Sequence, residues 1–201
     1  MVNKHWWEAA REAILRLRPR RILDVGPAEA MLWRGYGFGG KHNKRDPRVP
    51  REWFDFGAHV VLVDIDMYRH PLDFVNASGE LLPFPDKSFD LVISTEVIEH
   101  VVNVEAFASE IMRVGRHWVV TTPAAEASGL MDEESAEKLF WMNPWLVNLI
   151  TAYPNDKYPH RAHKRVFTKE ELERLFPGSQ VLELKTDAPE SHWLVLNFSL
   201  N

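Results

Sequence analysis

Cysteine is absent from this chain of 201 residues, and the absence limits its chemistry. Without a thiol the protein has no disulfide, thiolate zinc site, iron–sulfur cluster or cysteine nucleophile. Long apolar runs are also missing, since the longest, near Phe140 to Ile150, is interrupted by Asn143, Pro144 and Asn148. The first residues, MVNKHWWEAAREA, carry charges where a signal peptide has an apolar core. These features predict a cytoplasmic protein without a membrane span.

An excess of positive charge is missing as well. Lys and Arg number 24 against 29 Asp and Glu, which gives a formal charge of −5 and argues against general coating of nucleic acid. Hydrophobic residues make up 45% of the chain, enough for a buried core. We therefore expect a single domain over residues 1–201, and we predict no metal centre.

Apolar runs typical of buried strands alternate with amphipathic patterns typical of helices. Strands are expected at residues 21–25, 60–64, 89–94, 118–122, 181–184 and 193–198. Helices are expected at 3–18, with Asn3 as the cap, at 96–114, and from Thr168, with Glu171 in the capping-box position. This alternation predicts an α/β fold with a doubly wound, mostly parallel sheet, closed by an antiparallel hairpin at its edge.

Two segments are not required by this sheet. Residues 34–57 form a basic insert, and residues 124–165 form a helical cap segment. The insert follows the first strand, so it is expected to lie over the ligand face of the sheet. It could close over an anionic substrate, contact RNA, or serve only as a solubilising loop or an oligomer contact such as that of a homodimer.

Polar residues stand at the ends of three predicted strands. Asp24-Val25-Gly26 ends the first strand, Asp64-Ile65-Asp66 the second, and Ser94-Thr95-Glu96 the third. In doubly wound sheets, ligands bind at the carboxyl ends of the strands. A carboxylate at the position of Asp64 is suited to hold the two hydroxyls of a ribose, although a helix cap occurs at the same place.

Four sequence blocks resemble the class I S-adenosylmethionine-dependent methyltransferases. These blocks are ILDVGPAEA, VLVDID, ELLPFPDKSFDLVISTEVIEHV and VVTTP. The resemblance is strongest to the small-molecule type that includes the ubiquinone and menaquinone biosynthesis enzymes. It implies a Rossmann-like sheet of seven strands with an antiparallel last strand. It also implies S-adenosylmethionine as the cofactor and S-adenosylhomocysteine as the product.

The resemblance further implies which residues hold the cofactor. The first strand and its turn would border the methionine end, Asp64 would bind the ribose, and Ile65 would lie against the adenine. The implied cofactor residues are Asp24, Gly26, Pro27, Ala28, Asp64, Ile65, Ser78, Gly79, Ser94 and Thr95. Ala28 and Ala30 replace two glycines of the family pattern, and Ser78 replaces its usual acidic residue. These departures leave open a degenerate relative that has lost the activity.

The expected reaction is transfer of a methyl group to a small-molecule or carrier-bound acceptor by in-line displacement. A general base is needed only if the acceptor must lose a proton. His100 and His163 are the predicted catalytic residues, and Glu96 and His160 are further candidates. The alternative for His100 is a hydrogen-bonded structural residue of the helix. An RNA methyltransferase that uses the basic insert is the alternative enzyme, and a binding module without activity is the alternative outside enzymes.

The chain contains eight tryptophans, a high number for its length. Trp6, Trp7, Trp118 and Trp193 fall in predicted helices and strands of the framework. The others, in or beside the insert and the cap segment, are Trp33, Trp53, Trp141 and Trp145. Their rings could enclose an aromatic or apolar acceptor, or simply pack the cap segment onto the sheet.

Overall fold

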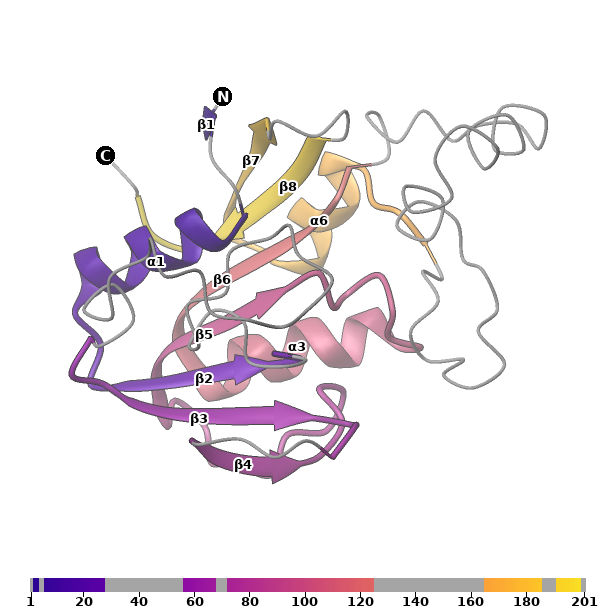
Figure 1. Cartoon of the computed structure of the whole chain (residues 1–201). Coiled ribbons are helices and arrows are strands. Elements are labelled where there is room, and N and C mark those ends of the chain that lie inside the picture. Colours follow the sequence, from indigo (N-terminus) through magenta and orange to yellow (C-terminus); the bar gives the residue numbers. More distant parts are fainter. Residues whose placement is uncertain are drawn as a thin grey trace, which may run out of the picture.

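The computed structural model describes residues 2–3, 6–27, 56–67, 72–124, 165–185 and 191–199. These residues form one sheet of eight strands with helices on both faces (Figure 1). Most of the basic insert and of the helical cap segment lies outside the described residues, so both remain predictions.

The elements follow one another along the chain with strands and helices interleaved. Three helices are described, α1 (Trp6–Leu17), α3 (Val104–Val114) and α6 (Lys169–Leu175). The strands are β1 (Val2–Asn3), β2 (Arg21–Val25), β3 (His59–Asp64), β4 (Asp73–Asn76), β5 (Phe89–Thr95), β6 (Gly115–Pro123), β7 (Gln180–Lys185) and β8 (Ser191–Leu196). In the described part of the chain, no helix has both the length and the apolar character to cross a membrane.

The strands lie in the order β1-β7-β8-β6-β5-β2-β3-β4. All neighbours are parallel except β8, which is antiparallel to both β6 and β7. Strands β2 to β8 therefore confirm the expected mostly parallel sheet of seven strands with an antiparallel last strand. The two-residue strand β1 is an addition beside β7. The predicted closing hairpin is antiparallel, but β8 lies inside the sheet, between β6 and β7.

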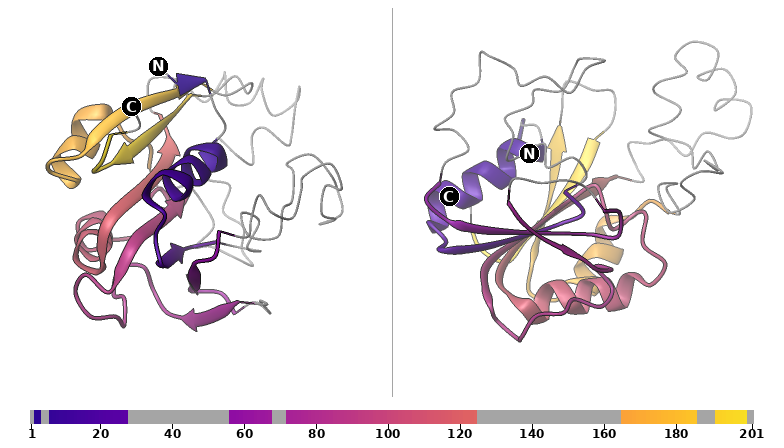
Figure 2. Two further views of the ribbon diagram at one scale, coloured as in Figure 1. Left: turned by 90° about the vertical axis from the view of Figure 1, so that its left-hand side faces the viewer. Right: turned by 60° about the horizontal axis from the view of Figure 1, so that its bottom comes forward.

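The helices cover the two faces of the sheet separately (Figure 2). Helix α1 packs on one face, where Ala10 and Ile14 join a core with Ile22, Leu62 and Leu91. Helices α3 and α6 pack on the other face with the alternate residues of the same strands. Because side chains alternate across a strand, β2, β3 and β5 bury apolar residues on both faces, as their continuous apolar runs predicted.

Two predicted helix starts are wrong. Asn3 pairs with Lys185 in the short strand β1, and α1 begins only at Trp6, so Asn3 is not its cap. The helix predicted over 96–114 begins at Val104, because the Asn103 side chain accepts a hydrogen bond from the backbone N–H of Ala106 at 2.9 Å.

The predicted start of α6 is confirmed. Thr168 caps the helix and accepts a hydrogen bond from the backbone N–H of Glu171 at 3.3 Å. The Glu171 carboxylate accepts one in return from the backbone N–H of Thr168 at 2.8 Å.

Arg113 on α3 holds the loop that connects β4 to β5. Its guanidinium donates to the backbone oxygens of Phe84 at 2.7 Å and Leu82 at 3.0 Å. It also bonds the carboxylates of Glu110, at 2.6 and 2.8 Å, and Asp86, at 2.8 Å. The hydrogen bond from Arg113 lowers the pKa of Glu110. One side chain therefore fixes a loop of irregular backbone to the helix.

We predict that Arg113→Ala lowers the free energy of unfolding by about 2–4 kcal/mol at pH 7, because two backbone oxygens and two carboxylates lose the hydrogen bonds that Arg113 donates. The lowered pKa of Glu110 means that its contribution is complete above its ordinary pKa and is lost as the pH falls through the lowered value. The difference between variant and wild type should therefore shrink in acid. Denaturant unfolding measures both effects. Arg116→Ala, at a mostly exposed site, is the control and should cost less than about 1 kcal/mol.

Candidate functional site

The parallel strands place the sequence-predicted residues along one edge of the sheet. Residues 24–26, 64–66 and 94–96 stand at or directly after the carboxyl ends of β2, β3 and β5, which are neighbours in the sheet. In folds of this kind the crevice beyond these ends is where ligands bind. The structure therefore brings together three segments that are far apart in the sequence.

The turn after β2 is built around Gly26. Gly26 has a φ of 71°, and its N–H donates to the backbone oxygen of Val63 on β3 at 2.7 Å. A Cβ atom at this position would overlap the side chain of Val97. Asp24 and Pro27 beside it are buried. Only glycine fits both the left-handed backbone and this close contact, so Gly26 is required for the shape of the turn.

Ser94 ties β5 to this turn. The side chain is fully buried, and its hydroxyl donates to the backbone oxygen of Val25 at 3.1 Å. Thr95 follows at the end of β5, where it is half-buried and in register with Thr121 of β6. Ser94 thus holds the end of β2, which is predicted to border the methionine end of the cofactor.

The turn after β3 presents a carboxylate and an apolar side chain. Asp64 is half-buried, and its Oδ1 atom accepts a hydrogen bond from the backbone N–H of Asp66 at 2.9 Å. Ile65 is 59% exposed, so its apolar surface is available to a ligand at this edge. Asn76 of β4 braces the turn by donating to the backbone oxygens of Asp64 at 3.0 Å and Ile65 at 2.8 Å.

Ser78 and Gly79 follow β4 in the connection to β5. The Ser78 hydroxyl accepts a hydrogen bond from the backbone N–H of Glu80 at 3.2 Å. A Cβ atom on Gly79 would lie 2.7 Å from the ring of Phe107 and 3.0 Å from Val25. Gly79 therefore packs against the last residue of β2 and the buried ring of Phe107, where a larger side chain would not fit.

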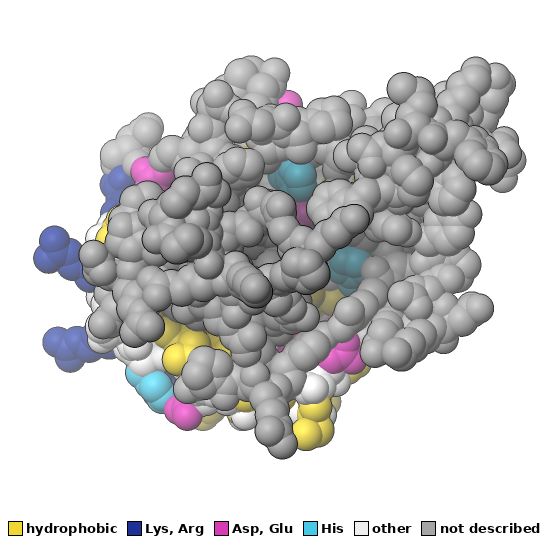
Figure 3. All heavy atoms as spheres, in the orientation of Figure 1, with side chains coloured by type: hydrophobic (Ala, Val, Ile, Leu, Met, Phe, Trp, Pro, Cys, Tyr) yellow, Lys and Arg dark blue, Asp and Glu magenta, His cyan; other side chains and the backbone are white. Residues whose placement is uncertain are grey.

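A second group of polar side chains lies on the side of β5 that faces β6 and β8. Of these residues, the sequence predicts a role only for Glu96 and His100. The Glu96 carboxylate accepts a hydrogen bond from the Thr121 hydroxyl at 2.8 Å and lies 3.1 Å from the Nε2 atom of His192. Thr122 donates to Glu99 at 3.1 Å. On the face shown in Figure 3, histidine and acidic side chains are visible between the residues drawn in grey.

Glu99 is fully buried within this second group. Burial, followed by the negative charge of Glu96, raises the pKa of Glu99 well above its ordinary value. The Nε2 atom of His100 lies 3.9 Å from the Glu99 carboxylate. Within the described residues, no three His, Asp or Glu side chains are arranged to hold a metal ion.

Some predicted residues lie outside the described part of the chain. These are Ala28, Ala30, His160 and His163, with most of the basic insert and helical cap segment and four of the tryptophans. Trp118 and Trp193 are buried in strands, as predicted, and their indole N–H groups donate to Ser179 at 3.0 Å and to the backbone oxygen of Phe167 at 2.8 Å.

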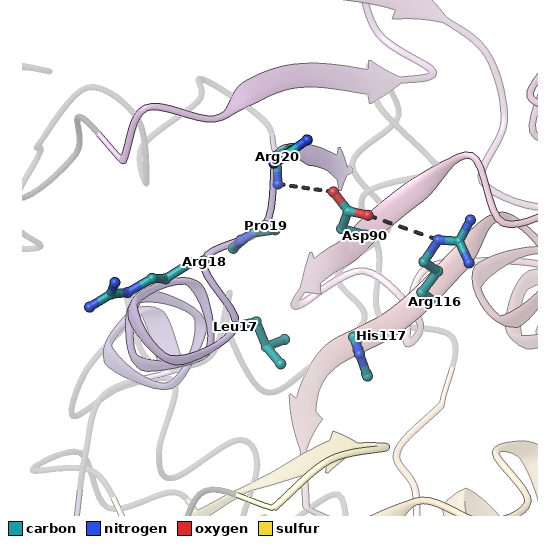
Figure 4. A pocket seen from close by; sticks show the side chains of 7 residues that line it. All are labelled: Leu17, Arg18, Pro19, Arg20, Asp90, Arg116 and His117. Carbon is teal, nitrogen blue, oxygen red and sulfur yellow. Dashed lines mark hydrogen bonds and ion pairs between the residues drawn. The ribbon is translucent and has the colours of Figure 1, made fainter.

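An open pocket of about 310 Å³ lies at the opposite edge of the sheet (Figure 4). It is lined by the end of α1, by the link from α1 to β2, and by residues near the starts of β5 and β6. Asp90 at its centre accepts hydrogen bonds from the backbone N–H groups of Arg20 at 2.9 Å and Arg21 at 3.0 Å, and Arg116 lies 3.9 Å away. These residues stand at the amino ends of the strands, so this pocket is separate from the candidate site.

The strand order, the reversed β8 and the glycine turn after β2 define the class I methyltransferase fold. A sequence profile described as a methyltransferase domain matches residues 48–117. An uncharacterized methyltransferase of Mycobacterium marinum is 33% identical over 122 residues, which cover 58% of this chain and 42% of the relative. The chain therefore spans less than half the length of this curated relative.

Solved structures share the fold at low sequence identity. The YcgJ protein of Bacillus subtilis superposes with a TM-score of 0.57 at 16% identity, over 90% of this chain and 70% of that one. A SAM-dependent methyltransferase of Aquifex aeolicus gives a TM-score of 0.51 at 11% identity, over 94% of this chain and 89% of that one. A chain of the Haloferax volcanii complex between the Trm112 methyltransferase activator and a methyltransferase gives 0.53 at 15% identity, over 94% and 88%. These structures show that the chain shares their fold.

We predict that Gly26→Ala lowers the free energy of unfolding by about 2–4 kcal/mol, because it adds a left-handed alanine and an overlap with Val97. Gly178→Ala is a matched control, since Gly178 has a φ of 79° but nothing within 4 Å of its Cβ position. Gly178→Ala should lower the free energy of unfolding only by the cost of a left-handed alanine, about 1–2 kcal/mol. Denaturant unfolding of both variants gives the comparison, and equal losses would show that the contact with Val97 is unimportant.

Proposed function

We propose that this protein transfers a methyl group from S-adenosylmethionine to a small-molecule or carrier-bound acceptor. The observation that carries the proposal is the edge formed by β2, β3 and β5. There a left-handed glycine turn, a carboxylate and an exposed isoleucine stand at neighbouring strand ends. This set suits a nucleoside with a charged amino-acid tail.

In this proposal the cofactor residues are those that the family resemblance implies. The glycine turn, with Asp24 and Pro27, borders the methionine end, and Thr95 lines it from β5. Asp64 accepts hydrogen bonds from the ribose hydroxyls, which its position at the end of β3 supports. Ile65 covers one face of the adenine, and Ser78 and Gly79 border the adenine edge. Ala28 belongs to the proposed set by its place in the sequence.

The cofactor supplies a methyl group that its sulfonium already activates. The protein therefore needs mainly to align the acceptor with that methyl group and to exclude water. His100 and His163 remain candidates for taking a proton from the acceptor. The charged residues of the insert and the aromatic residues of the cap segment remain candidates for binding an anionic or aromatic acceptor.

Binding of S-adenosylhomocysteine tests the cofactor assignment. At a ligand concentration of 100 times the Kd, linkage adds about 2.7 kcal/mol of stability, which should raise the Tm by roughly 5–10 °C. Asp64→Ala should remove most of this rise, because the ribose then loses its acceptor.

Asp73→Ala is the matched control, since Asp73 is an exposed aspartate at the other end of the neighbouring strand, where it contacts His59 at 2.7 Å. It should keep the full rise in Tm. An unchanged rise in Asp64→Ala would contradict the ribose assignment. A normal rise without methyl transfer to any acceptor would favour the degenerate binding module. Transfer to RNA alone would favour the alternative enzyme.

A further inference from the structure

We propose that the Glu96 carboxylate binds the O–H or N–H group of the acceptor and takes its proton during methyl transfer, with Thr121 and His192 as positioning residues. This inference rests on the proposed function and adds a class of acceptor to it. The acceptor is then one that must lose a proton, such as an alcohol, a phenol or an amine.

Glu96 stands directly after β5, on the side of the candidate site away from β3. Its backbone N–H donates to the backbone oxygen of Thr121 on β6 at 3.0 Å. Its φ is 58°, in the left-handed region that side chains other than glycine rarely adopt. Such a conformation persists only where the surroundings enforce it, and here the link to β6 does so.

Side chains from two further strands hold the carboxylate. The Thr121 hydroxyl donates to one oxygen at 2.8 Å, and the Nε2 atom of His192 on β8 lies 3.1 Å from the other. The His192 side chain is only 7% exposed, whereas that of Glu96 is 26% exposed. The Glu96 carboxylate is therefore more open to an acceptor than Thr121 or His192, and these two neighbours set its orientation.

Glu99 is the fully buried carboxyl group beside Glu96 in this second group. The Glu99 side chain is 0% exposed, and among the described residues its Oε1 atom has no hydrogen-bond partner. Its other oxygen accepts a hydrogen bond from Thr122 at 3.1 Å. Burial and the charge of Glu96 raise the pKa of Glu99 well above its ordinary value. The Nε2 atom of His100 lies 3.9 Å from this buried carboxyl group, whereas Glu96 is oriented by Thr121 and His192, so we assign the proton transfer to Glu96.

The proton transfer balances without any further reagent. The acceptor's X–H bond breaks, its proton goes to the Glu96 carboxylate, and its electron pair forms the new bond to the methyl carbon. The electrons of the broken carbon–sulfur bond stay on sulfur, so the positive charge of the sulfonium and the negative charge of Glu96 are both neutralised. An acceptor that is already ionised, such as a thiolate, needs no such base.

The test compares wild type with Glu96→Gln, using catechol, benzylamine and 4-nitrothiophenol as acceptors for labelled S-adenosylmethionine. Glu96→Gln should lower kcat for catechol and benzylamine by about 100-fold or more, and should change transfer to the pre-ionised thiol less than about 3-fold. His192→Gln should show the same selective loss of kcat to a smaller degree. Glu105→Gln, at an exposed position in the first turn of α3, should match wild type.

A binding measurement gives a second readout that needs no turnover. In protein saturated with S-adenosylhomocysteine, Glu96→Gln should weaken catechol binding about 10-fold while binding of 1,2-dimethoxybenzene stays unchanged, because only catechol can donate. Both ligands are followed by saturation-transfer NMR.

The rise in Tm with S-adenosylhomocysteine keeps failure of this inference separate from failure of the proposed function. If wild type shows no rise, the proposed function fails. With a normal rise in both proteins, three results would overturn the role of Glu96. These are equal catechol transfer by the two proteins, an equal loss for all three acceptors, and no binding or transfer of catechol and benzylamine by wild type.

Discussion

The parallel pairing of β5 with β2 on one side and β6 on the other is the constraint on which the rest of the structure depends. Leu91, Val92 and Ile93 of β5 are fully buried, so this strand packs on both faces of the sheet. Its register aligns Asp24 with Ile93 and Thr95 with Thr121. A shift of one residue would turn each of these side chains to the other face, so burial holds the register firmly.

This register divides the carboxyl edge into two chemically different halves. Toward β2 and β3 the site consists of backbone at Gly26, one aspartate and an exposed isoleucine, which suits a ligand recognised largely by shape. Toward β6 and β8 it consists of carboxyl, hydroxyl and imidazole groups in mutual contact. The two proposals, cofactor binding and proton transfer, therefore fall on different strands, and β5 contributes residues to both.

The sequence predicted the central strands and failed at the margins of the sheet. Continuous apolar runs revealed β2, β3, β5 and β6, because strands buried on both faces need such runs. Strand β4 has only four residues, two of them exposed, and therefore carries no clear pattern. The sequence wrongly predicts Asn3 as a helix cap, because its pairing with Lys185, 182 positions away, leaves no local signal in the sequence.

The candidate site could be predicted where it depends on strand ends, and not where it depends on contacts between distant segments. Gly26 and Asp64 follow directly from the rule that ligands bind at carboxyl ends. Asn76, which braces the turn after β3, and His192, which contacts Glu96, have no motif of their own. The only signal for His192 was a polar residue at the start of an otherwise apolar closing strand. Its role requires the strand order that brings β8 beside β6.

The backbone supports the same division of the edge. Among the described residues other than glycine, three have a left-handed φ: Arg18, Lys87 and Glu96. Arg18 ends α1, with its N–H on the backbone oxygen of Ile14 at 2.9 Å, and this conformation is common at helix ends. Lys87 is tied to the end of α3, where its Nζ atom donates to the backbone oxygens of Met112 at 2.6 Å and Gly115 at 2.9 Å.

Glu96 is different, because its φ of 58° occurs at the end of a strand and not at the end of a helix. Such a backbone conformation lowers the stability of the fold by about 1–3 kcal/mol, and the pairing of β5 with β6 must offset this loss. An extended residue at this position would continue β5 and carry the carboxylate away from Thr121 and His192. This conformational cost therefore accompanies the placement in which three strands, β5, β6 and β8, hold one carboxylate at the carboxyl edge of the sheet.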